Sequence, residues 1–139
     1  TVLYRMNGSP SVSGKTPFTD VRTDEWYSAA VLWAYQNGIV TGMSDTTFAP
    51  INNVTREQMA TILFRYTKTA APDKAKASAD LSGFADAGSV NDWAVDAMRW
   101  AVGQKLIAGI TLGQSVYLQP RGNATRAQAA TVLTRYYAQ

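Results

Sequence analysis

The chain has 139 residues, with 13 basic and 10 acidic side chains and with neither cysteine nor histidine. This composition excludes disulfides, thiolate metal sites and histidine general bases, so any enzyme chemistry would rest on carboxylates, hydroxyls or lysine. The basic residues behind the net charge of +3 are scattered rather than gathered in a stripe, which argues against nucleic-acid binding. No uninterrupted apolar run reaches the about 18 residues of a membrane span, so we expect no membrane insertion.

The chain is organised by an internal repeat. A Phe-x-Asp triplet, a pair of Trp seven residues apart and an Asn-x-Thr-Arg tetrapeptide each occur twice, in the same order. In the first and second copies these elements are residues 18–20 and 84–86, Trp26 with Trp33 and Trp93 with Trp100, and residues 53–56 and 123–126. The helical sequence after the tetrapeptide also matches the first residues of the chain. We therefore predict two complete repeats preceded by the last helix of a third.

The repeat divides the chain into five segments. They are the terminal helix of a partial first repeat at 1–7, a linker at 8–17, repeat 2 at 18–66, a second linker at 67–83 and repeat 3 at 84–139. Both linkers are rich in Ser, Gly, Pro, Ala and Lys. We expect them to be exposed and mobile, because such compositions offer little apolar surface to bury.

Each complete repeat is predicted to fold as helix, loop, helix. The apolar residues of 26–34 and of 93–101 follow the spacing of an amphipathic helix, so the second Trp of each pair belongs to the core. Asn37-Gly38 ends the first of these helices. The second helix of each repeat begins with a Thr-x-x-Gln capping box, at 55–58 and again at 125–128.

Taken together, the elements Phe-x-Asp, Trp, Gly-Ile-Val-x-Gly, Phe-x-Pro and Thr-Arg-x-Gln resemble the S-layer homology motif of bacterial cell-surface proteins. The resemblance implies an all-α fold in which three helix-loop-helix motifs pack as a pseudo-threefold helical prism, here with an incomplete first lobe. It also implies an extracellular location at the bacterial cell surface. Grooves between the lobes would hold a secondary cell-wall polysaccharide, often one that bears pyruvate ketals.

The chain departs from the family pattern at two places. The recurrent Thr-Arg-Ala-Glu signature corresponds to 55–58 and 125–128, where Gln replaces the acid in both copies. Gln still closes the capping box, so we expect both helix starts to survive. The Gly that ends the first helix of the motif matches Gly38, whereas repeat 3 carries Lys105 there, which predicts a different ligand preference for that copy.

Arg56 and Arg126 are the leading candidate site residues. Each stands at the first helical position, where free backbone N–H groups and the helix dipole already favour an anion. A guanidinium at this place makes a site for a pyruvyl carboxylate or a phosphate, and a plain surface arginine is the alternative.

Five further residues are predicted to contribute to glycan binding. Trp26 and Trp93 open their helices, where an indole can stack on a pyranose or simply be part of the packing. Asp20 and Asp86 either accept hydrogen bonds from sugar hydroxyls or cap a turn. Gly38 joins the predicted site as the glycine of the family motif.

The sequence therefore predicts a non-catalytic anchoring module that binds an acidic cell-wall polysaccharide and needs no metal or cofactor. Its acidic residues cluster near helix starts, where they are favoured electrostatically, rather than as a catalytic pair. The alternative is a structural protein–protein assembly module of a surface-layer or extracellular protein. Self-association through the incomplete first repeat motivates that alternative, because so short a helix needs a surface on which to dock.

Overall fold

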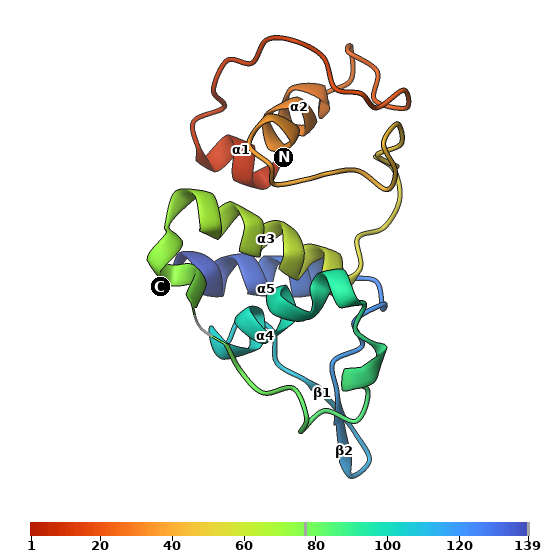
Figure 1. The fold of residues 1–139 in the computed structure, drawn as a ribbon, viewed down its shortest axis with the longest axis vertical. Helices are drawn as coiled ribbons and strands as arrows, with labels where there is room; N and C mark the ends of the chain where they lie inside the picture. Colours follow the sequence, from red (N-terminus) through yellow and green to blue (C-terminus); the bar gives the residue numbers. More distant parts are fainter. Residues whose placement is uncertain (77, 139) are drawn as a thin grey trace. The chain divides into compact units, whose positions relative to one another are not determined.

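The computed structural model describes residues 1–76 and 78–138 (Figure 1). The chain divides into two compact units, Thr1–Asn52 and Asn53–Gln139. The boundary lies inside repeat 2, between its front half and its last helix. Each unit therefore combines the last helix of one repeat with the front half of the next repeat.

Unit 1 contains two helices joined by a long loop. Helix α1, Val2–Met6, packs against α2, Ser28–Gln36. Leu3 of α1 and Ala30 and Val31 of α2 are buried, and the rings of Tyr4 and Trp33 lie 5.8 Å apart. The core of this unit thus forms where the terminal helix meets the front half of repeat 2.

A second apolar cluster holds the loops of unit 1 together. The buried Phe18 ring lies 5.3 Å from the ring of Tyr35 and 5.4 Å from that of Phe48. Ile39, directly after α2, is only 1% exposed. The Phe of the Phe-x-Asp triplet therefore works as a core residue that ties α2 to the loop that follows it.

Unit 2 contains the remaining elements. In chain order they are α3 (Arg56–Ala70), the 3-10 turns η1 (Pro72–Lys76), η2 (Ala87–Ser89) and η3 (Asp92–Ala94), α4 (Val95–Gly103), the strands β1 (Ile110–Leu112) and β2 (Ser115–Tyr117), and α5 (Arg126–Tyr137). Helix α3 packs against α4, η1 and η3. The fully buried side chains at the centre of this unit include those of Trp100, Met98, Leu106 and Leu118.

The packing of α3 on α4 repeats the packing of α1 on α2. Phe64 stands in the repeat where Tyr4 stands in the first helix, and its ring lies 5.4 Å from that of Trp100. The prediction that Trp100 is a core residue is confirmed, because only 1% of it is exposed. Trp33, its counterpart in the smaller unit 1, is half-buried.

Two expectations about the elements need correction. The first helices begin at Ser28 and Val95, so Trp26 lies in the turn before α2 and Trp93 lies in η3. The segment 67–83 is not an exposed connector throughout, because α3 continues to Ala70 and only 1% of Thr67 is exposed. The Thr67 side chain is a buried neighbour of α5, a long-range contact that local composition does not reveal.

A short hairpin departs from the all-α expectation, although the fold is helix-rich. Strands β1 and β2 pair antiparallel, with Thr111 opposite Val116, and extend away from the helices of unit 2 (Figure 1). The loop between Gly109 and Leu118 is longer than its counterpart in repeat 2, and its β-branched residues Ile110, Thr111 and Val116 favour strands. Gly113, at a φ of +62°, forms the turn.

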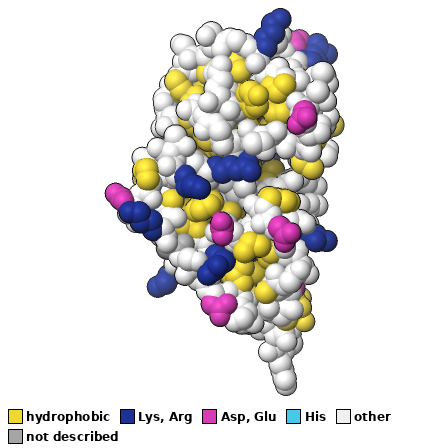
Figure 2. Space-filling model, in the orientation of Figure 1, with side chains coloured by type: hydrophobic (Ala, Val, Ile, Leu, Met, Phe, Trp, Pro, Cys, Tyr) yellow, Lys and Arg dark blue, Asp and Glu magenta, His cyan; other side chains and the backbone are white. Residues whose placement is uncertain are grey.

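The surface carries charges of both signs. Over unit 2, basic and acidic side chains lie interspersed on the face drawn in Figure 2, as the scattered sequence positions indicate. Within the described part of the chain, no helix is both long enough and apolar enough to cross a membrane.

Candidate functional site

The starts of α3 and α5 lie side by side in unit 2. Both predicted capping boxes are present: Thr55 and Thr125 accept from the backbone N–H of the Gln three residues on, and the Gln side chain accepts in return. An isolated antiparallel bridge pairs Thr55 with Asn123. The rings of Tyr66 and Tyr136, near the other ends, are 6.2 Å apart, so the two helices run in the same direction.

Arg56 is buried, contrary to the simplest expectation for an arginine at a helix start. Its Nε donates to the carbonyl oxygen of Leu118 at 2.8 Å and its Nη2 to that of Ala108 at 3.0 Å. Burial lowers the pKa of the guanidinium, an effect that the nearby charge of Asp86 opposes. The residue holds both ends of the β1–β2 loop from the start of α3.

Asp86 also binds backbone groups of this loop. Its carboxylate oxygens accept from the backbone N–H of Leu118 at 2.6 Å and of Gln119 at 2.8 Å. Leu118 is thus bonded on both sides of its backbone: its carbonyl oxygen accepts from Arg56, and its N–H donates to Asp86. Two predicted site residues therefore come together, and the partner of each is the backbone of the loop.

Asp20 does in unit 1 what Asp86 does in unit 2. It accepts from the N–H of Phe48 at 2.9 Å and of Ala49 at 2.7 Å, and these bonds lower the pKa of its carboxyl. Ala49 and Gln119 both have a positive φ, 58° and 48°. Two roles were open for these acids, sugar binding and turn capping. In both repeats the carboxylate caps a turn in the structure.

Arg126 differs from Arg56 although the sequence around it is alike. Its side chain is exposed, and within residues 1–76 and 78–138 its guanidinium has neither a hydrogen bond nor an ion pair. It stands beside the free N–H groups at the start of α5. This arrangement is able to hold a carboxylate or a phosphate.

Trp26 and Trp93 are exposed aromatic residues at equivalent places in the two repeats. Trp26 is 72% exposed and Trp93 is 53% exposed. The rings of Trp26 and Tyr27 lie 5.5 Å apart and nearly perpendicular, at 82°. Each Trp therefore offers a platform on the surface of its unit.

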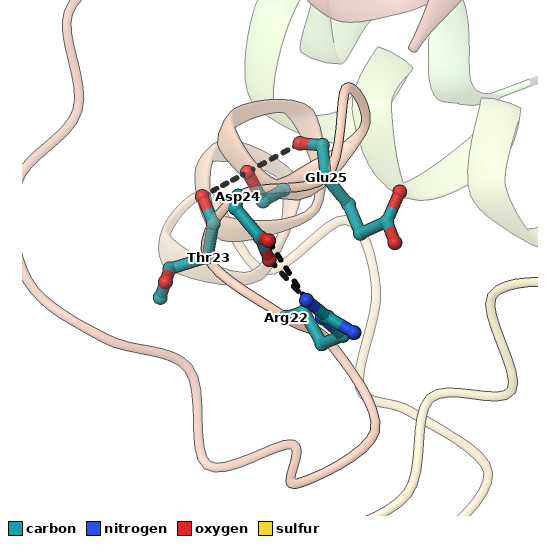
Figure 3. Close-up of polar contacts among 5 residues, drawn as sticks. Arg22, Thr23, Asp24 and Glu25 are labelled. Carbon is teal, nitrogen blue, oxygen red and sulfur yellow. Dashed lines mark hydrogen bonds and ion pairs between the residues drawn. The ribbon is translucent and has the colours of Figure 1, made fainter.

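The turn before Trp26 is held by local polar contacts (Figure 3). Arg22 and Asp24 form a two-pronged ion pair, with donor–acceptor distances of 3.1 and 2.9 Å, which lowers the pKa of Asp24. The Ser28 hydroxyl lies 2.7 Å from the carbonyl oxygen of Glu25 and 3.1 Å from that of Thr23. These contacts fix the turn from which Trp26 projects.

The equivalent turn before Trp93 is held by a residue that sequence reasoning missed. Glu57, in the first turn of α3, is only 2% exposed, and its carboxylate accepts from the N–H of Asn91 at 3.1 Å and from its side-chain amide at 2.5 Å. Acids are common at helix starts, so an acid at this position does not by itself indicate a contact across 34 residues. Repeat 3 has Ala127 at the corresponding place.

Gly38 acts through its backbone. It ends α2 with a φ of +67°, and a Cβ built there would meet nothing within 4 Å. Lys105, its counterpart, takes the same left-handed conformation at a φ of +58°. The departure from the family glycine therefore leaves the path of the chain after α4 unchanged.

Among the described residues, no three His, Cys, Asp or Glu side chains gather in a way that could hold a metal ion. The features that recur are backbone-anchoring acids, an arginine at a helix start and an exposed Trp beside a fixed turn. They define a helical repeat module.

Comparison with known proteins identifies the family. The S-layer homology domain matches residues 17–60 and 83–130, and the chain belongs to this family. S-layer homology domains are non-catalytic anchoring domains of S-layer and cell-surface proteins, so the chain is a cell-surface module.

Relatives include both surface-layer proteins and enzymes. The chain is 35% identical over 88% of its length to the surface-layer 125 kDa protein of Lysinibacillus sphaericus. It is 34% identical over 96% of its length to an endoglucanase of Bacillus sp. (strain KSM-635). The chain spans only 10% and 14% of these two relatives, so it corresponds to a small part of each.

The fold also has a solved counterpart. An undecaheme cytochrome from the S-layer of Carboxydothermus ferrireducens matches 99% of this chain and 20% of its own, with a TM-score of 0.53 and 24% sequence identity. At this level of identity the likeness concerns the fold alone.

Proposed function

We propose that this module fastens a larger protein to the bacterial cell wall by binding an acidic secondary cell-wall polysaccharide without a covalent bond. The observation that carries the proposal is the repeated match to the S-layer homology domain, at 17–60 and 83–130. Relatives described as surface-layer and cell surface proteins support the same location for the ligand.

In this proposal the exposed residues contact the glycan. Trp26 and Trp93 stack on pyranose rings, and Arg126 pairs with a pyruvyl carboxylate or a phosphate of the polymer. An exposed guanidinium at a helix start combines its own charge with free backbone N–H groups, which favours an anion over a neutral sugar at that place.

The other predicted site residues contribute through the loops that they hold. Arg56, Asp20 and Asp86 already engage backbone groups, so we propose that they shape the binding surface. Gly38 does so by ending α2 in a left-handed conformation. These residues would affect glycan affinity mainly through the stability of their units.

We further propose that three motifs close into a pseudo-threefold prism with a ligand groove at each lobe junction. Weak sites on one chain that bind one polymer would reinforce each other, because the second contact forms at a high effective concentration. The mildly basic net charge of +3 would favour encounter with a polyanionic wall.

Sedimentation with purified cell-wall sacculi tests the proposal. The chain should sediment with untreated sacculi and stay in the supernatant after mild acid removal of pyruvate. Arg126→Ala should reduce the bound fraction, whereas Lys15→Ala, which removes an equal charge at an exposed loop position, should not. Equal binding by Arg126→Ala would contradict the role proposed for this arginine.

A second candidate is assembly with other protein chains. Arg56 fixes the front half of the following repeat, whereas Arg126, at the same place in α5, is exposed. A front half-repeat from another chain would supply the same two carbonyl acceptors. Sedimentation velocity without glycan distinguishes the candidates: a concentration-dependent dimer that Arg126→Ala abolishes favours assembly, and a monomer favours the glycan.

A further inference from the structure

A pocket of about 230 Å³ lies in unit 2, at the end of α3 and α5 opposite to Arg56 and Arg126. Its lining includes Tyr66, Thr67, Lys74, Trp100, Tyr136 and Tyr137. The volume is below the about 300–1,000 Å³ of pockets for drug-sized ligands, so it suits a group the size of one sugar ring. None of the residues predicted to bind the acidic glycan is part of it.

The aromatic rings of the pocket are arranged around Tyr136. The Tyr136 ring lies 6.2 Å from that of Tyr66, 6.5 Å from that of Trp100 and 5.1 Å from that of Tyr137. Tyr136 and Tyr137 are nearly perpendicular, at 89°, so their faces point in different directions. With 42% of Tyr137 exposed, its ring gives a ligand access to an aromatic wall.

Polar contacts fix these rings in place. The Trp100 Nε1 donates to the carbonyl oxygen of Lys74 at 2.9 Å, which ties η1 to α4. The Tyr136 hydroxyl lies 3.0 Å from Oγ1 of Thr67, which itself donates to the carbonyl oxygen of Leu63 at 2.8 Å. These bonds hold the Trp100 and Tyr136 rings in place before any ligand arrives, which reduces the entropy lost on binding.

Opposing charges around the pocket favour a neutral ligand over a charged one. The last carbonyl groups of α3 and α5 are near, and the C-terminal end of a helix dipole repels anions. Lys74 supplies a positive charge that opposes a cation, and no acid is among the described lining residues. Burial raises the pKa of Tyr136 and of Tyr137, so both hydroxyls stay protonated at neutral pH and can donate and accept.

We infer that this pocket is a second carbohydrate subsite, which takes a neutral pyranose. Apolar C–H faces of the sugar pack on the tyrosine rings, while its hydroxyls contact the phenol groups at the rim. The inference rests on the proposed function in one respect: the neutral sugar would be a unit of the same cell-wall polysaccharide.

Nuclear magnetic resonance titration of the full chain with neutral methyl glycosides tests this inference. Methyl glucoside and methyl N-acetylglucosaminide should shift the Trp100 indole signal, with dissociation constants near ~10 mM, as befits a ligand with a single-ring contact. Methyl glucuronide, which carries a carboxylate, should bind about tenfold more weakly. Tyr137→Ala should weaken binding of the neutral glycosides by about tenfold or more.

Tyr35→Ala is the matched control, because Tyr35 is similarly exposed, at 38%, but belongs to unit 1. It should leave the titration unchanged. The inference is overturned if no signal of the pocket moves, if methyl glucuronide binds best, or if Tyr137→Ala binds like the parent chain. Because the glycosides are free in solution, this outcome is independent of whether the chain sediments with sacculi.

Discussion

The guanidinium of Arg56 donates to the carbonyl oxygen of Leu118 at 2.8 Å, across 62 residues of sequence. Through this bond the last helix of repeat 2 holds the loop of repeat 3. The boundaries of the compact units therefore lie half a repeat away from the boundaries of the sequence repeats. A repeat of this kind completes its core only with a neighbour, as in other repeat proteins.

The buried Arg56 and the exposed Arg126 predict very different effects on stability. Arg56→Ala leaves the carbonyl oxygens of Leu118 and Ala108 without these donors, so we expect the free energy of unfolding of unit 2 to fall by about 2–4 kcal/mol. Arg126→Ala should change it by less than about 0.5 kcal/mol. Urea unfolding followed by circular dichroism measures both, and equal effects would contradict the assigned contacts.

The contact between Glu57 and Asn91 predicts energetic coupling between α3 and the turn before Trp93. Glu57→Ala removes two acceptors from a buried position, so we expect a loss of about 1.5–3 kcal/mol. A double-mutant cycle with Asn91→Ala should give a coupling of about 1–3 kcal/mol. Additive effects of the two substitutions would show that the residues act independently.

The hydrogen bonds of Asp20 should make the stability of unit 1 sensitive to acid. Its pKa is lower in the folded state, so its stabilising effect is present above the unfolded pKa of about 3.9 and is lost as the pH falls through the lower folded pKa. Asp20→Asn should therefore flatten the decrease in melting temperature of unit 1 below about pH 4. Amide signals of unit 1, followed by nuclear magnetic resonance on heating, measure this. Asp45→Asn, at an exposed position, should keep the slope of the parent chain.

Substitutions of two glycines near α2 should lower the free energy of unfolding by different amounts. A Cβ at Gly38 meets nothing, so Gly38→Ala costs only the left-handed backbone, about 1 kcal/mol. A Cβ at Gly42 would collide with the Phe18 ring and lie 2.8 Å from two backbone oxygens, so Gly42→Ala should cost about 3 kcal/mol or more. Chemical unfolding of the two variants side by side checks the order, and a larger loss at Gly38 would contradict it.

Local features of the fold could be predicted from the sequence. The capping boxes at Thr55 and Thr125 follow from residues three apart, and the burial of Trp100 follows from helical spacing. The exposed Trp26 and Trp93 were placed near helix starts, although the helices begin two residues later. These features depend on neighbours along the chain, which a sequence displays directly.

Long-range partners could not be predicted in the same way. Charged residues are seldom fully buried, so nothing in the sequence marked Arg56 and Glu57 as interior. Their acceptors and donors lie in a different repeat, and local periodicity does not identify them. The same holds for the displacement of the compact units by half a repeat, which depends on which helix packs on which front half.

The most direct test of the anchoring account is calorimetric titration of purified wall polysaccharide into the chain. The polymer that bears pyruvate should bind, and the same polymer stripped of pyruvate should bind at least about tenfold more weakly. Arg126→Ala should reduce affinity for the first polymer and leave the weak binding of the second unchanged. Equal binding of both polymers, or of neither, would contradict the account.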